Sequence, residues 1–172
     1  MDDQARSLRA VFAEATRKQS QLTGDTNSTA FQENLSSAIT TFEECLQIAS
    51  RVSLFSPNET LDDVSSGDLQ YMLIHFHLAE LVLKITGGDR NSNLARARAH
   101  YEQFLKLLDS YDVLPKPDGK MYEQYKEDPQ SFSTASKTDA AARRQTKIAR
   151  FREEKELKRK LEVCSMQCLL AK

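Results

Sequence analysis

The chain has 172 residues, of which 40% are apolar and 28% charged, and its 24 Lys/Arg against 25 Asp/Glu leave a net charge of −1 at pH 7. This length suits one domain with a core of its own, and five Gly with four Pro argue against a turn-rich all-β fold. No apolar run is long enough to cross a membrane, the acidic start Met1–Gln4 is no signal peptide, and three cysteines are too few for a disulfide framework, so we expect a cytoplasmic protein.

Two amphipathic helices are predicted in the first part of the chain. Residues 3–20 carry apolar residues at steps of three and four, which is the spacing of one helix face. These are Leu8, Val11, Phe12 and Ala15. After a polar break at 24–29, a longer helix with a broad apolar face runs to about Leu54. We expect Pro57 to end it, because proline disfavours helix in the residue before it.

Two further helices complete the predicted bundle. The segment 68–86 is apolar nearly all round, so we expect it in the middle of the bundle, stopped by Gly87 and the glycine that follows. A fourth helix is predicted over 92–111, broken by Pro115. Its inward-facing residues are expected to be Leu94, Ala97, Tyr101, Phe104, Leu105 and Leu108. A short helix over 120–126 is then expected, anchored by Met121, Tyr122 and Tyr125, with a connector from 128 to 137.

These spacings predict an all-α fold class built of antiparallel helical hairpins. Two helices share a pattern in which a small residue precedes an aromatic residue by four, as in the second helix of a tetratricopeptide hairpin. The two patterns are Ala38-x₃-Phe42-x₂-Cys45 and Ala97-x₃-Tyr101-x₂-Phe104. Their separation does not fit a repeat of about 34 residues, so we expect a tetratricopeptide-like bundle or solenoid without a regular repeat. We interpret 1–172 as a single helical domain, with a core bundle at 1–112, a connector at 113–137 and a basic C-terminal helix at 138–172.

The last predicted helix is rich in positive charge. Thr138 suits its N-cap, and Asp139 suits the positive end of the helix dipole. From 143 to 160 there are nine Lys/Arg and three Glu, a net charge of +6 on an otherwise acidic chain. We expect the few apolar residues to dock along one side as a narrow seam while the cations face outward. The seam residues are Ile148, Phe151, Leu157 and Leu161, and the outward cations are Arg143, Arg144, Lys147 and Arg150.

No residue pattern indicates catalysis, and we expect neither a cofactor nor a metal. His75 and His77 are two apart, so on a helix they point in nearly opposite directions and are expected to be packing or partly solvated residues. Cys164 and Cys168 share a helix face but lack a second pair of ligands. Cys45 lies on an apolar face and is expected to be a small core residue.

The basic helix supports several interpretations. A solvated face is the plainest one. The acidic balance elsewhere disfavours nucleic acid, and the apolar residues are too few for a membrane surface. An acidic protein partner fits best, because Arg144 and Lys147 are three apart and share a helix face. Arg can form two parallel hydrogen bonds to one carboxylate, and Lys adds a mobile positive charge. We therefore expect a monomer without a nucleic-acid or membrane partner; the alternative is a helical nucleic-acid-binding protein that uses residues 143–160.

The stretch 143–161, RRQTKIARFREEKELKRKL, closely resembles the signature of the TOR-pathway, type 2A phosphatase-associated proteins, the alpha-four or immunoglobulin-binding protein one family. Three earlier stretches resemble the same family, in order, and extend the likeness over 28–162. They are LQYMLI at 69–74, ARAHYEQFLKLLDSYDVL at 97–114 and DPQSFS at 128–133.

This resemblance implies a non-enzymatic, tetratricopeptide-like regulator in TOR signalling. It implies binding to the catalytic subunits of type 2A and related Ser/Thr protein phosphatases, which are held or protected apart from the scaffold subunit. The family's phosphatase-contacting basic pair falls on Arg144 and Lys147, and the charge pattern adds Arg143, Arg150 and Lys158 as phosphatase-binding residues. Family members continue with a further helical segment and an acidic tail, which residues 163–172 do not resemble.

Overall fold

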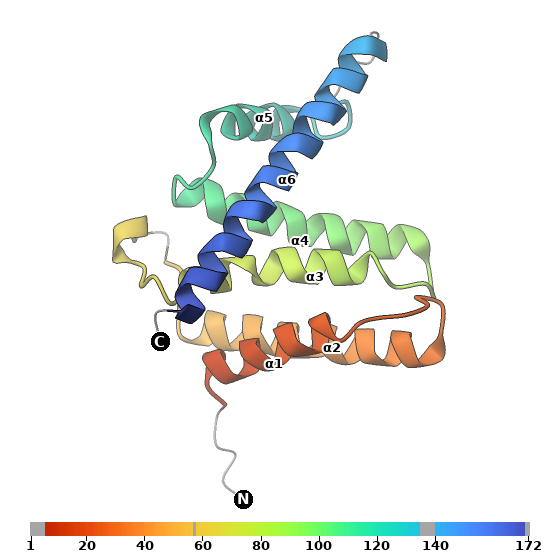
Figure 1. The fold of residues 1–172 in the computed structure, drawn as a ribbon, viewed down its shortest axis with the longest axis vertical. Helices are drawn as coiled ribbons and strands as arrows, with labels where there is room; N and C mark the ends of the chain where they lie inside the picture. Colours follow the sequence, from red (N-terminus) through yellow and green to blue (C-terminus); the bar gives the residue numbers. More distant parts are fainter. Residues whose placement is uncertain (1–5, 57, 135–139, 171–172) are drawn as a thin grey trace, which may run out of the picture. The chain divides into compact units, whose positions relative to one another are not determined.

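The computed structural model describes residues 6–56, 58–134 and 140–170, with side chains as far as Val163. Its contacts divide the chain into two compact units, Met1–Gly119 and Lys120–Lys172. Over the described residues the regular structure consists of α-helices and short 3₁₀ helices, which confirms the all-α fold class (Figure 1). Pro57, Thr138 and Asp139 lie outside the described residues.

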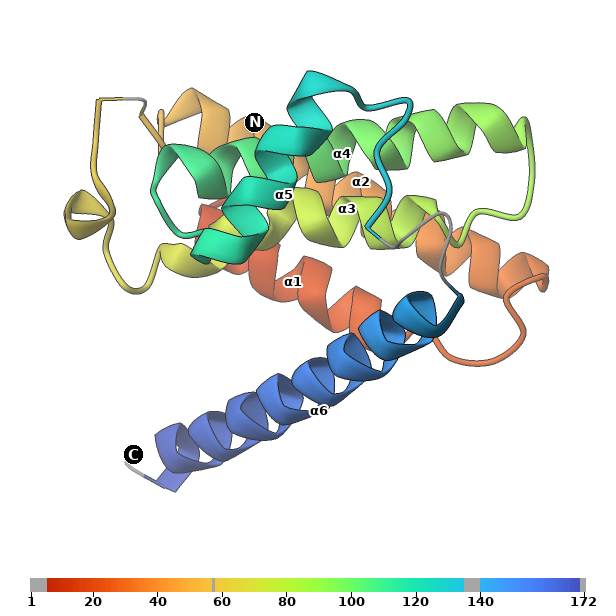
Figure 2. The same ribbon diagram turned by 90° about the horizontal axis from the view of Figure 1, so that it is seen from above.

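The first hairpin of the first unit pairs α1 (Leu8–Ser20) with α2 (Thr29–Arg51), as the apolar spacing predicts. The two helices run side by side in opposite directions (Figures 1 and 2). Serine caps both of them, because the hydroxyls of Ser7 and Ser28 each accept a hydrogen bond from a backbone N–H in the first turn.

Helix α2 ends at Arg51 through a turn of its own, so the predicted stop at Pro57 is wrong. Ser53 takes up left-handed backbone, with a φ of 50°. The N–H of Leu54 then donates to the carbonyl of Ala49 at 3.0 Å, and the N–H of Ser53 donates to the carbonyl of Ser50 at 3.1 Å, which are the two hydrogen bonds of a Schellman motif. Glycine is the usual residue at the left-handed position, and a serine there conceals the helix end in the sequence.

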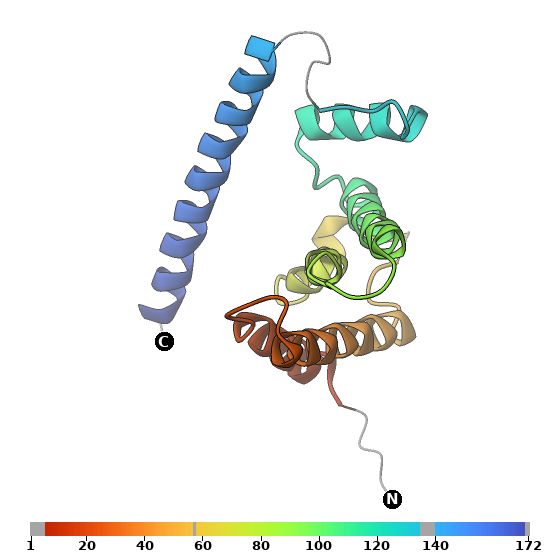
Figure 3. The ribbon, with the colours of Figure 1, turned by 90° about the vertical axis from the view of Figure 1, so that its right-hand side faces the viewer.

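The apolar segment 68–86 forms two elements rather than one helix. Leu69–Leu73 form the 3₁₀ helix η2, and Ile74–Val82 form α3, after the short 3₁₀ turn η1 (Leu61–Asp63). The end of α3 precedes Gly87 because the chain tightens there into bonds of the i→i+3 type, from the N–H groups of residues 84 and 85. The predicted central position is confirmed: α3 packs against α2 on one side and α4 on the other (Figure 3).

Helix α4 (Arg90–Ser110) begins at Asp89, whose carboxylate accepts hydrogen bonds from two backbone N–H groups of the first turn. It ends in a second Schellman motif, with Asp112 at a φ of 52°. Ala97 is buried as predicted, whereas Leu94 is 43% exposed and its predicted inward position is wrong. Among the described residues of α4, Ala97 is the one member of the buried cluster of the unit, so the rest of this helix contributes little to the cluster.

The core of the first unit is one cluster of buried apolar side chains. It comprises Val11, Phe12, Ala15, Phe31, Leu35, Ala38, Ile39, Phe42, Cys45, Tyr71, Ile74, Leu78, Leu81, Val82 and Ala97. Cys45 is fully buried, as predicted, and burial raises the pKa of its thiol to about 12. Both small residues of the tetratricopeptide-like pattern, Ala38 and Ala97, belong to this cluster. The tetratricopeptide-like arrangement itself stays a prediction.

The second unit contains most of α5 (Lys116–Glu127) and all of α6 (Ala140–Leu170). Helix α5 begins before its predicted start at 120, because Pro117 lies in the first turn, where its missing N–H has no intrahelical partner to lose. Tyr122 is buried, and the ring of Tyr125 meets Phe132 edge to face at 5.4 Å. Over the described residues, none of the helices is both long enough and apolar enough to span a bilayer.

Candidate functional site

Helix α6 carries the predicted site, and its positive charge is concentrated in its first half. Residues 143–152 include five Lys/Arg and no Asp/Glu, whereas residues 153–162 include four of each. Four cations of the first half belong to the predicted site and are exposed: Arg143, Arg144, Lys147 and Arg150. A net charge of +5 is therefore confined to ten residues, or about three turns of helix.

The second half of α6 neutralises itself by ion pairs. Lys158 Nζ lies 2.6 Å from Glu154 Oε1, and Arg159 Nη2 lies 2.8 Å from Glu156 Oε1. The hydrogen bond to Glu154 raises the pKa of Lys158. Lys158 thus differs from the other predicted site residues, because its charge already has an acidic neighbour.

The cations of the first half have no such neighbour in the described part of α6. None of its described carboxylates forms an ion pair with Arg144 or Lys147. The guanidinium of Arg150 lies near a neutral atom instead, with Nη2 3.7 Å from Sδ of Met121 in the same unit. The charges of Arg144 and Lys147 are therefore available to carboxylates of a partner.

The cluster of cations in the first half of α6 destabilises this helix. Arg143 and Arg144 lie close to the N-terminus of α6, where the helix dipole is positive and cations are unfavourable. Lys147 follows them at spacings of four and three, so like charges share a face and repel each other. By contrast, Glu154 precedes Lys158 by four residues, which is the favourable order for a helix pair. Helix stability therefore does not account for the cations of the first half.

The predicted seam of apolar residues on α6 is wrong. Ile148, Phe151, Leu157 and Leu161 are 41%, 66%, 53% and 69% exposed. The reason lies in their spacing, because successive residues of a helix are rotated by about 100°. Ile148 and Leu157, nine residues apart, therefore point in opposite directions, and one seam cannot hold both. Phe151 points instead to the side of Lys147, four residues before it.

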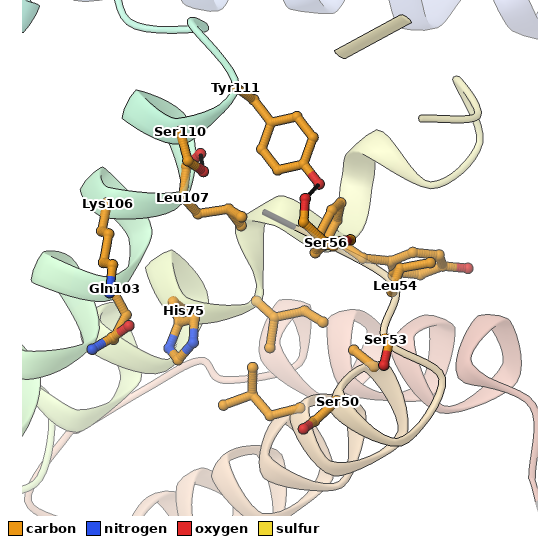
Figure 4. Close-up of a pocket in the computed structure, with 15 residues that line it drawn as sticks. Ser50, Ser53, Leu54, Ser56, His75, Gln103, Lys106, Leu107, Ser110 and Tyr111 are labelled. Carbon is orange, nitrogen blue, oxygen red and sulfur yellow. Dashed lines mark hydrogen bonds between the residues drawn. The ribbon is translucent and has the colours of Figure 1, made fainter. Parts of the chain in front are cut away.

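A second feature is a cavity of about 580 Å³ in the first unit (Figure 4). Serines near the end of α2 lie on one side of it, and Gln103 and Lys106 of α4 on the other. Its apolar lining includes Ile74 and Leu107. Among the described residues that line it, Lys106 is the one charged side chain, and none is Asp or Glu. The cavity therefore offers no carboxylate for acid–base chemistry.

The two histidines of α3, His75 and His77, both pack against other aromatic rings. His77 stacks on Phe42 with the ring centres 5.1 Å apart. His75 lines the cavity, and its Nδ1 lies 3.1 Å from Nδ1 of His100 on α4. Burial, and then the neighbouring His100, lower the pKa of His75 to about 4. This histidine pair carries no sequence signal, because its members are 25 residues apart and meet only through the packing of α3 on α4.

Comparison with known proteins gives a family match over most of the chain. A family model described as the TAP42-like family matches residues 8–168. The match covers α1 to α5 and α6 up to residue 168, and it extends beyond both ends of the range 28–162 over which the sequence resembles the family.

Individual relatives match over similar stretches. An uncharacterised protein of Schizosaccharomyces pombe is 30% identical over 162 residues, which are 94% of this chain and 43% of that protein. The PP2A regulatory subunit TAP46 of Arabidopsis thaliana is 31% identical over 120 residues, 70% of this chain and 27% of that protein. The type 2A phosphatase-associated protein 42 of Saccharomyces cerevisiae is 27% identical over 138 residues, 70% of this chain and 38% of that protein. The chain thus spans less than half the length of these curated relatives.

Proposed function

The chain belongs to the TAP42-like family, and from this premise we propose that it is a regulatory protein that binds the catalytic subunit of a type 2A Ser/Thr protein phosphatase. Two of its relatives carry phosphatase association in their names. In this proposal the chain holds or protects the catalytic subunit apart from the scaffold subunit, within TOR signalling in the cytoplasm. It acts by binding and not by a catalytic activity of its own.

The observation that carries the proposal is the unpaired charge in the first half of α6. Arg144 and Lys147 are exposed, lie on one helix face, and have no ion pair within the described part of α6. The planar guanidinium of Arg144 can form two parallel hydrogen bonds to one carboxylate of the phosphatase, and Lys147 can reach a second. Arg143 and Arg150 add positive potential on either side, which speeds the encounter with an acidic surface. Lys158 extends the site, with a smaller contribution because it is paired with Glu154.

Charge reversal of the pair tests this proposal. We expect Arg144→Glu with Lys147→Glu to weaken binding to a purified type 2A catalytic subunit at least 100-fold, or about 3 kcal/mol, because carboxylates would then face carboxylates. The fold should persist, since both side chains are exposed. Affinity is measured by biolayer interferometry and helix content by circular dichroism.

A matched control separates the site from the overall charge. Arg159→Glu with Lys160→Glu changes the net charge of the same helix by the same amount, in the half where acidic and basic residues balance. We expect this variant to bind within about threefold of the unchanged chain, which corresponds to less than 1 kcal/mol. Equal losses in the two variants, or none in either, would contradict the assignment of Arg144 and Lys147.

A further inference from the structure

Phe151 is the one exposed side chain among the Phe and Tyr residues that the structure describes. The sequence contains eight Phe, five Tyr and no Trp, and the structure describes all of these side chains. Twelve of them are buried or half-buried, whereas Phe151 is 66% exposed. A large aromatic ring in water is an unsatisfied apolar surface, and such rings are typical anchors of protein interfaces.

The helical register places this ring among cations that have no ion pair within the described part of α6. Lys147 precedes Phe151 by four residues and Arg144 precedes it by seven, so all three lie on one face of α6. Ile148, which is 41% exposed, lies three residues before Phe151 at the edge of the same face. The spacing i, i+3, i+4, i+7 is that of a helix which presents one continuous contact surface.

We propose that Phe151 is the apolar anchor of this surface and fills an apolar pocket of the phosphatase catalytic subunit that is bordered by carboxylates. The inference rests on the proposed function and deepens it by naming the chemistry of the partner site. Charge complementarity requires carboxylates opposite Arg144 and Lys147, and the register requires an apolar recess one helical turn beyond Lys147, opposite Phe151. Once Phe151 is buried, water is excluded around the two ion pairs, which strengthens them.

The positions of the other apolar residues favour a protein over a membrane as the partner. An interfacial helix needs a continuous apolar face opposite its cations. Here Leu157 points away from Ile148, and Phe151 shares its face with Arg144 and Lys147, so no such face forms over the described side chains. A recess of limited size matches one ring and its neighbour Ile148, whereas a bilayer does not.

The test compares two equally exposed apolar residues of the same helix. We expect Phe151→Ala to weaken binding of the full chain to purified type 2A catalytic subunit by tenfold or more. Leu161→Ala is the matched control, because Leu161 is 69% exposed and lies in the half of α6 where charges balance. We expect it to bind within twofold of the unchanged chain. Circular dichroism of each variant checks that the helix content is unchanged.

The outcomes separate this inference from the proposed function. Unchanged affinity of Phe151→Ala, with binding lost in the Arg144→Glu, Lys147→Glu variant, would overturn the anchor and leave the phosphatase assignment standing. Equal losses for Phe151→Ala and Leu161→Ala would also overturn it, since position on the helix would then not matter. If the unchanged chain failed to bind the catalytic subunit, both proposals would fall. Binding to phosphatidylserine vesicles that depends on Phe151, with phosphatase binding unaffected, would reassign the ring to a membrane.

Discussion

At the scale of single residues, the contact between His75 and His100 makes the packing of α3 on α4 sensitive to pH. Their Nδ1 atoms are 3.1 Å apart, so one ring must donate a proton and the other must accept it. Protonation of both would place two cations in contact. His100 also feels the charges of Arg96 and Glu43, and burial is the largest of the causes that lower its pKa. Both His75 and His100 are therefore neutral in the folded chain at neutral pH.

This pair predicts a loss of stability in mild acid. Burial lowers the pKa of His75 from its ordinary 6.5 to about 4 in the folded chain, so between these values the unfolded chain binds more protons. The contribution of His75 to the free energy of unfolding is constant above pH 6.5 and decreases as the pH falls below this value. We expect a loss of about 1–2 kcal/mol by pH 5, less than full burial would give because the rings are partly exposed.

Urea unfolding at pH 7.5 and pH 5 measures this loss. His75→Asn is the control, because an amide can still donate to His100 Nδ1 but does not titrate in this range. The variant should lose less stability between the two pH values than the unchanged chain does. An identical pH dependence in both would show that groups other than His75 account for the acid sensitivity.

At the scale of one element, α6 combines a half that opposes helix formation with a half that supports it. Like charges at 143–152 repel each other near the positive end of the helix dipole, whereas Lys158 and Arg159 pair with glutamates. We expect Arg144→Gln with Lys147→Gln to increase the helix content of a peptide spanning 140–163, with about 0.3–0.5 kcal/mol for each repulsive pair removed. Lys158→Gln should decrease it, because the ion pair with Glu154 is lost.

Circular dichroism at 222 nm measures both changes on the same peptide. If the Gln variant were less helical, the cations of the first half would be stabilising α6, and the case that they serve a partner would lose its physical basis. The two opposite signs expected within one helix make the comparison independent of the helix propensities of Lys, Arg and Gln, which are nearly equal.

The existence of the elements could be predicted from the sequence, but several of their ends could not. Apolar residues at steps of three and four mark α1, α2 and α4, and the continuous apolar run marks α3 as central. The helix ends at Ser53 and Asp112 depend on left-handed backbone without glycine, for which the sequence has no reliable signal. The change from 3₁₀ to α geometry at Ile74 has none either.

The candidate site was predictable in its charges but not in its apolar part. The exposed cations follow from the composition of 143–152 and its helical spacing. The expected seam failed because Ile148 and Leu157 lie on opposite sides of the helix, which the register alone shows. The pairing of His75 with His100 depends instead on how α3 packs on α4, and no local pattern contains that information.

At the scale of the whole molecule, the residues that stabilise the fold and those proposed to bind a partner lie in different units. Every member of the buried cluster falls between Val11 and Ala97, within the first unit. The proposed binding residues, Arg144, Lys147 and Phe151 among them, fall in the second unit. Substitutions on the exposed face of α6 should therefore change recognition without changing the stability of the bundle.

Truncation tests this separation directly. A chain that ends at Gly119 keeps the whole buried cluster, so we expect it to unfold cooperatively in urea, with a free energy of unfolding within about 1 kcal/mol of that of the full chain. It should not bind the phosphatase catalytic subunit measurably, because it lacks α6. A loss of several kcal/mol would show that residues 120–172 contribute to the core. Retained phosphatase binding by the truncated chain would move the binding site from α6 to the helical bundle.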